Sequence, residues 1–142
     1  MKFEKFVKKA MPYGKTIEVE GTKYLAFENM AAKLPEWCGD MGVKSKDATI
    51  FEDIVSLGIY GENEAELKRA YLPEADSKAK DIIRVFDDGE RAVEISNDAF
   101  ALIERSDMTV IADYDGTSAL LVGHRADIED FEPDLIILDM ED

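Results

Sequence analysis

The sequence predicts a single α+β domain over residues 1–142, with a mainly antiparallel sheet built from hairpins and several short helices packed against it. Three observations carry this prediction. Alternating apolar segments come in pairs joined by glycine-containing turns, which is typical of hairpins. Helix signals lie between these pairs and no strand–helix–strand period recurs, so a doubly wound parallel sheet is not expected. A length of 142 residues also falls in the usual range for one domain.

Residues 1–14 predict a short basic amphipathic helix and a turn. Apolar residues share one helical face, the lysines lie mostly on the other, and Pro12-Tyr13-Gly14 ends the helix. The apolar face consists of Phe3, Phe6, Val7 and Ala10. This helix either docks on a membrane or partner or caps the domain. The capping role is favoured, because about ten residues fall below the roughly 12–15 at which an isolated helix becomes marginally stable.

The next segments predict a hairpin, a helical turn and a strand. Ile17–Glu20 and Lys23–Phe27 alternate across Gly21-Thr22, the pattern of a half-buried hairpin. Residues 30–34 are compatible with a helical turn before Pro35, and residues 37–42 read as irregular chain. Residues 54–60 are rich in β-branched and aromatic side chains and predict a buried strand.

The middle of the chain predicts two helices around a hairpin. Asn63 with Glu66 three positions later suits a helix start, and an apolar stripe then extends toward Pro73. Residues 82–85 and 92–95 flank Asp87-Asp88-Gly89, which is typical of a tight hairpin turn. Ser96 is the predicted cap of the helix that follows.

The last third predicts three strands. Residues 108–112 and 119–122 are apolar and are joined through residues 113–117, a connection rich in turn formers. Residues 135–138 form a continuous apolar run, as expected of a strand covered on both faces.

Charge is divided unevenly along the chain. Residues 1–49 hold 9 Lys/Arg and 7 Asp/Glu, whereas residues 50–142 hold 8 and 25, within a formal net charge of −15. Residues 50–142 therefore predict an acidic face. Such a face repels nucleic acid and anionic membranes and attracts basic partners.

Several functional classes are not expected. No segment approaches the roughly 18 consecutive apolar residues of a spanning helix, and the N-terminus lacks the apolar core of a signal peptide. The single cysteine, Cys38, and single histidine, His124, offer neither an intrachain disulfide nor a zinc site. We therefore expect a cytoplasmic protein without a metal or cofactor.

Residues 110–117 resemble motif I of haloacid-dehalogenase-like phosphotransferases. The resemblance implies Asp113 as the nucleophile and Asp115 as the second carboxylate, with magnesium bridging nucleophile and phosphate. Only 25 residues follow Thr117, and they contain no lysine for the position that the family requires. The same residues are also ordinary hairpin-turn chemistry, which is the favoured interpretation. A magnesium-dependent phosphohydrolase is therefore a minor alternative.

Residues 133–140 resemble the phosphoacceptor strand of response-regulator receiver domains. This resemblance implies that Asp139 accepts phosphate and that Asp87 and Asp88 hold magnesium. A receiver continues with two further strands after the phosphoacceptor, whereas this sequence ends at Asp142. A buried strand explains the same apolar run.

The leading interpretation is a non-enzymatic acidic module that binds or inhibits a basic protein. Immunity proteins and nucleic-acid mimics have this charge pattern, and phages or mobile elements often encode them. A homo-oligomeric structural protein is the main alternative. The predicted partner-binding residues are a dense acidic group with one aromatic anchor: Asp127, Glu129, Asp130, Phe131, Glu132 and Asp134.

Overall fold

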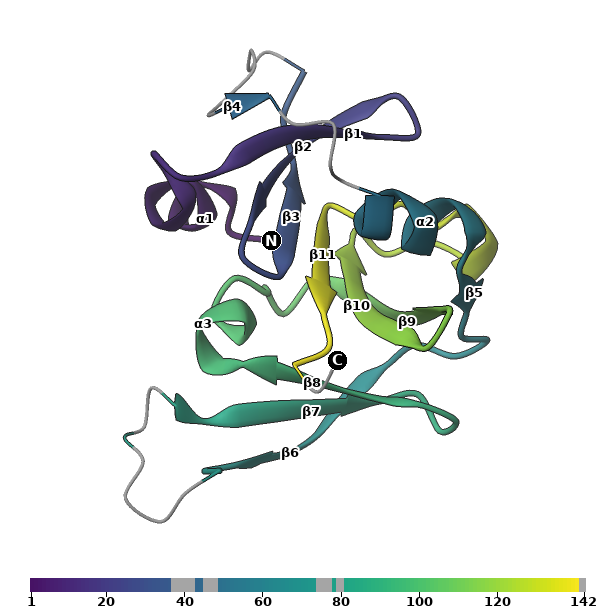
Figure 1. Ribbon diagram of the computed structural model, residues 1–142. Helices are drawn as coiled ribbons and strands as arrows, with labels where there is room; N and C mark the ends of the chain where they lie inside the picture. Colours follow the sequence, from purple (N-terminus) through teal and green to yellow (C-terminus); the bar gives the residue numbers. More distant parts are fainter. Residues whose placement is uncertain (37–42, 45–48, 74–77, 79–80, 141–142) are drawn as a thin grey trace.

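The fold is α+β and mainly antiparallel, as predicted, and contains two sheets (Figure 1). A computed structural model of the chain describes residues 1–36, 43–44, 49–73, 78 and 81–140. The large sheet has the strand order β4-β1-β2-β3-β11-β10-β9-β5, and the small sheet has the order β6-β7-β8. All strand pairs are antiparallel except the short β1–β4 pair.

The strands of the large sheet come from both ends of the chain. They are β1 (Lys15–Val19), β2 (Thr22–Phe27), β3 (Met30–Lys33), β4 (Val43–Lys44), β5 (Ile59–Tyr60), β9 (Met108–Tyr114), β10 (Thr117–Gly123) and β11 (Leu135–Leu138). The small sheet consists of β6 (Glu66–Tyr71), β7 (Ile83–Asp87) and β8 (Ala92–Ser96). The helices are α1 (Phe3–Ala10), α2 (Thr49–Leu57), α3 (Asn97–Phe100) and the 3-10 helix η2 (Ile128–Asp130).

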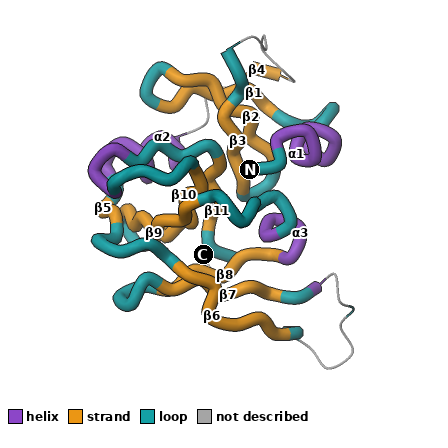
Figure 2. Tube along the Cα trace, turned by 180° about the vertical axis from the view of Figure 1, so that it is seen from behind, coloured by secondary structure: helices purple, strands orange, loops and turns teal. Residues whose placement is uncertain are grey.

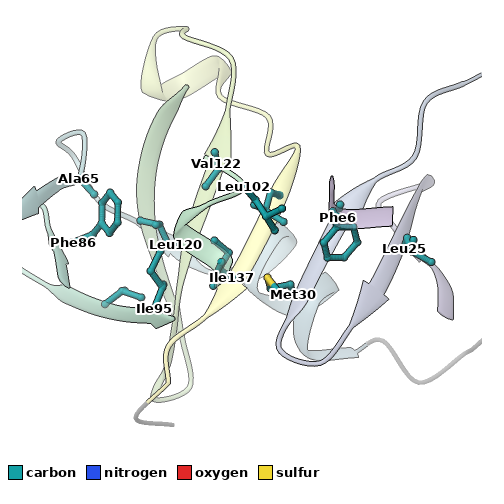
Figure 3. Close-up of a cluster of buried hydrophobic side chains, with 14 of the residues drawn as sticks. Phe6, Leu25, Met30, Ala65, Phe86, Ile95, Leu102, Leu120, Val122 and Ile137 are labelled. Atoms are coloured by element: carbon teal, nitrogen blue, oxygen red, sulfur yellow. The ribbon is translucent and has the colours of Figure 1, made fainter. Parts of the chain in front are cut away.

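Two buried clusters cover the two faces of the large sheet. In the first cluster, α1, α3 and the small sheet pack against one face. Figure 3 shows Leu120 and Ile137 of the large sheet between Phe86 and Ile95 of the small sheet on one side and Phe6 of α1 on the other. In the second cluster, α2 and Phe131 pack against the opposite face. The alternation of side chains along each strand supplies both clusters, so the large sheet is the central layer.

The predicted hairpins and the predicted C-terminal strand are confirmed. The β1–β2 turn is Glu20-Gly21, one residue earlier than expected, and both residues have positive φ, as in type I′ turns. Asp115 and Gly116 form the same kind of turn between β9 and β10. The β11 strand lies between β10 and β3, and three of its four residues are buried, which accounts for its continuous apolar run.

The predicted N-terminal helix and the predicted helix cap at Ser96 are also confirmed. The α1 helix buries Phe6 and Ala10, as its apolar face predicts. Ser96 caps α3, where its Oγ accepts a hydrogen bond from the amide of Ala99 at 3.1 Å. The α3 helix is only four residues long, so its apolar contacts continue into the following turn through Leu102.

The helical turn predicted for residues 30–34 is wrong, and the strand predicted for residues 54–60 forms only at its end, as β5. Residues 30–33 form β3, and Met30, Ala31 and Ala32 are buried because β3 lies between β2 and β11. Residues 49–57 form α2, because Phe51 and Ile54 recur at helical spacing and both pack in the second cluster. Short apolar runs do not distinguish a buried strand from a buried helix, which explains both errors.

The predicted helix after Asn63 is also wrong. Residues 66–71 form β6, an edge strand with a register shift between Leu67 and Arg69, and five of its six residues are exposed. The Asn63 side chain makes a long hydrogen bond (3.5 Å) to the carbonyl of Asp88 and does not cap a helix. Pairing with β7 therefore overrides the local helix signal. The irregular chain predicted for residues 37–42, which include Cys38, lies outside the described residues.

Within the described ranges, the structure contains no helix that is long and apolar enough to cross a membrane.

Candidate functional site

The predicted partner-binding residues lie in the connection between β10 and β11. We call residues 127–134 the acidic segment; it contains η2 and runs along the face of the large sheet that α2 covers. In Figure 2 this face is the one that carries α2, and α1 lies at the other side of the molecule.

The backbone of the acidic segment forms a local turn at its start and is bonded to the sheet at its end. At its start, the amides of Asp130 and Phe131 donate to the carbonyls of Asp127 and Ile128 at 2.9 and 3.2 Å. At its end, the amide of Asp134 donates to the carbonyl of Val122 at 2.7 Å. The segment is therefore attached to the sheet before β11 begins.

A buried tyrosine supports the same segment from a distant strand. The hydroxyl of Tyr24, on β2, donates to the carbonyl of Pro133 at 2.6 Å. Burial raises the pKa of Tyr24, and the nearby charges of Asp134, Glu132 and Glu20 raise it further. Negative charge therefore surrounds this phenol, which stays protonated and continues to donate at neutral pH.

Phe131 differs from the sequence expectation of an exposed anchor. Its ring is only 7% exposed and packs in the second cluster with Ile54 and Ile136. Phe131 lies beside Gly123, where an added Cβ would come within 3.1 Å of the ring. The physical reason is that the large apolar side chains of the segment, Ile128 and Phe131, have a nearby core to pack against. Phe131 therefore anchors the segment to its own domain.

The carboxylates of the segment point the other way, toward solvent. Four of them are exposed and have no cationic group within 4 Å among the described residues. These are Asp127, Glu129, Asp130 and Glu132. Asp134 is only partly exposed, and its Oδ2 lies 3.5 Å from Nε2 of the mostly exposed His124.

Of the described residues, two cations lie beside the segment: Lys33 lines a pocket with Glu132, and Arg125 pairs with a residue from elsewhere. Arg125 makes two hydrogen bonds to the carboxylate of Glu64, at 3.0 and 3.1 Å. This contact raises the pKa of Arg125. The guanidinium is thus engaged by Glu64, and the four exposed carboxylates outnumber the remaining neighbouring cation, Lys33.

Further acidic residues lie close to the segment, and sequence spacing did not identify them. Glu20 of the β1–β2 turn and Glu132 line a small pocket of about 150 Å³ together with Lys33 of β3 and Val55 of α2. The same helix carries Glu52, which is exposed, and Asp53, which is partly exposed. No local signal connects these residues, because the contacts depend on three separate parts of the chain.

Asp113 and Asp115 lie at a hairpin. Asp113 is part of β9, and its Oδ1 accepts a hydrogen bond from Ser118 Oγ at 3.2 Å. Asp115 is an exposed turn residue with φ of 49°. Among the described residues, no three His, Cys, Asp or Glu side chains are grouped to hold a metal ion. The turn leads into the antiparallel strand β10, whereas the phosphotransferase motif precedes a parallel α/β domain.

The acids implied by the receiver resemblance hold the small sheet. Asp88 is buried, and its Oδ1 accepts hydrogen bonds from the amides of Glu90 and Arg91 at 2.9 and 2.8 Å. Asp139 accepts a hydrogen bond from the amide of Glu94 at 3.2 Å. These contacts fix the β7–β8 hairpin and attach β8 to the residue after β11.

Comparisons with protein families, with curated proteins and with solved structures find no match to this chain. Functional interpretation therefore depends on the geometry of the site itself.

Proposed function

We propose that the chain is a non-enzymatic acidic module that docks a basic protein, as an immunity protein or a nucleic-acid mimic does. One observation carries this proposal: four exposed carboxylates, which make no ion pair with any residue that the structure describes, lie on a short segment whose backbone is fixed by the buried Phe131 and by Tyr24. A basic partner would find the backbone that carries these charges already fixed to the sheet at its end.

Order matters because immobilising flexible side chains and loops on binding costs free energy. The hydrogen bonds to Val122 and Pro133 hold the segment before any partner arrives. Complementary charge then speeds encounter, and the effect weakens as salt rises. The expected interaction is fast and strongly dependent on ionic strength.

The test compares retention of basic proteins from a lysate of the source organism on immobilised protein at about 0.1 M and about 0.5 M salt, where the Debye length falls from about 10 Å to less than half of that. The test variant carries D127N, E129Q, D130N and E132Q. The matched control carries E28Q, E36Q, E62Q and E90Q, which remove the same charge from exposed acids outside the segment.

The expected result is one or few basic proteins retained at low salt by the wild type and the control and lost by the segment variant. Equal loss in both variants would mean that only net charge matters. Retention by all three proteins would show that the acidic segment is not the docking surface.

A further inference from the structure

A small pocket lies where the acidic segment, the β1–β2 turn and α2 come together. Its volume is about 150 Å³, and its lining includes Glu20 of the turn and Glu132 of the segment. Sites for small molecules usually measure about 300–1,000 Å³. The size of this pocket therefore suits one long side chain of another protein better than a free metabolite.

The remaining lining of the pocket is largely apolar and held in place. Val19, Val55 and Pro133 contribute apolar surface. Tyr24, which also lines the pocket, is only 4% exposed, and its hydroxyl donates to the carbonyl of Pro133 at 2.6 Å. Apolar walls of this kind suit the methylene stem of a long cationic side chain, whose charged head then reaches the carboxylates.

The electric field in this part of the molecule is negative. Burial raises the pKa of Tyr24, and the charges of Asp134, Glu132 and Glu20 raise it further. Burial also raises the pKa of the neighbouring Tyr60 to about 12, and Glu20 adds to that shift. The charges that act on both phenols are thus carboxylates, as a pocket for a cation requires.

Lys33 does not neutralise the two carboxylates of the pocket. Of the described residues that line it, only Lys33 is cationic. No carboxylate in the described part of the chain lies within 4 Å of its ammonium group. The Lys33 side chain also borders two neighbouring pockets. Two carboxylates against one unpaired ammonium leave an excess of negative charge on the lining.

We propose that this pocket accepts one arginine side chain of the basic partner. The inference rests on the proposed function and names the chemical group that is recognised. A planar guanidinium has five donors in a fixed arrangement, so one arginine can bond to Glu20 and Glu132 together, whereas a lysine ammonium is a compact and strongly hydrated charge. Arginine is also among the residues that most often anchor protein interfaces.

Glu20 separates this inference from the docking role of the acidic segment, because it lies outside residues 127–134. The chain also offers a matched control at Glu28. Both glutamates are exposed, both occupy hairpin turns, and their φ values of 50° and 55° are nearly equal. Glu28 does not line the pocket. E20Q and E28Q therefore remove the same charge from the same kind of backbone position.

The test follows the binding of N-acetylarginine amide to the full chain by NMR at a constant ionic strength of about 0.1 M. N-acetylcitrulline amide is the uncharged control probe of similar shape. We expect the arginine probe to shift the amide signals of Thr22, Val55 and Glu132 with a roughly millimolar Kd, and the citrulline probe to shift them far less. E20Q and E132Q should each weaken binding about fivefold, E28Q should leave it unchanged, and K33M should strengthen it.

Three results would overturn the inference. They are the absence of local shifts at about 20 mM arginine probe, equal weakening by E20Q and E28Q, and equal binding of N-acetyllysine amide, which would show that any cation is accepted. The proposed function is tested separately by the lysate experiment with E20Q added. If E20Q retains the basic proteins that the segment variant loses, the acidic segment docks the partner without this pocket.

Discussion

Gly123 controls how closely the acidic segment approaches β10. A Cβ at this position would lie 2.4 Å from the carbonyl oxygen of Glu132 and 3.1 Å from the ring of Phe131. Real Cβ atoms do not come closer than about 3.0 Å to such an oxygen. In Gly123→Ala the backbone near Glu132 must therefore move by about 0.6 Å or more, which strains the hydrogen bond between Asp134 and Val122.

The sign of the change in stability in Gly123→Ala distinguishes a steric clash from the usual effect of replacing glycine by alanine. Where the backbone conformation suits alanine, a glycine-to-alanine change usually stabilises a protein by about 0.4–1 kcal/mol, because the unfolded chain loses entropy. Overpacking in a filled site costs about 1–3 kcal/mol. We expect the clash to exceed the entropic gain, with a fall in Tm of up to roughly 10 °C for a domain of this size.

Thermal unfolding followed by circular dichroism measures the change in Tm, and hydrogen exchange of the Asp134 amide measures the local effect. The expected result is a lower Tm with faster exchange at Asp134. A Tm equal to or above that of the wild type would refute the close approach of Glu132 to β10.

Three further predictions concern buried or capping contacts. Phe131→Ala should destabilise the fold by about 3–5 kcal/mol, measured by urea unfolding, because it removes a ring that is only 7% exposed; a loss below about 1 kcal/mol would contradict the anchoring role. Ser96→Ala should cost about 1 kcal/mol in the same assay by removing the hydrogen bond to the amide of Ala99, whereas Ser96→Thr should keep most of the stability. Burial raises the pKa of Tyr60 from the usual tyrosine value near 10 to about 12, so above pH 10 the unfolded chain releases a proton that the native chain retains. Stability should therefore decline between pH 10 and 12, and Tyr60→Phe should make the decline shallower; an unchanged pH profile in this variant would show that Tyr60 is not protected.

Local chemistry determined which elements were predictable. The hairpin turns and the Ser96 cap depend on residues within a few positions of one another, and these predictions are confirmed. The errors involve pairing between distant segments. Residues 30–33 form a strand because β11 lies beside them, and residues 66–71 form a strand because β7 does.

The candidate site follows the same division. The density of carboxylates in the acidic segment was evident from the sequence, and their exposure agrees with it for Asp127, Glu129, Asp130 and Glu132. The burial of Phe131, the support from Tyr24 and the neutralisation of Arg125 by Glu64 were not evident. The contacts of Tyr24 and of Arg125 join residues that are 109 and 61 positions apart in the sequence, so no local sequence pattern predicts them.

The junction between β3 and β11 has a kinetic consequence. The large sheet consists of an N-terminal group of strands and a C-terminal group, and these groups meet where Ala31 pairs with Ile136. The hairpins on each side can form early from neighbouring residues, whereas the junction requires closure of a loop of about one hundred residues. Substitutions at Ala31 or Ile136 should therefore mainly accelerate unfolding, while substitutions inside the β9–β10 hairpin should mainly slow folding. The pairing of β3 with β11, which forms last during folding, then determines the unfolding rate of the native sheet.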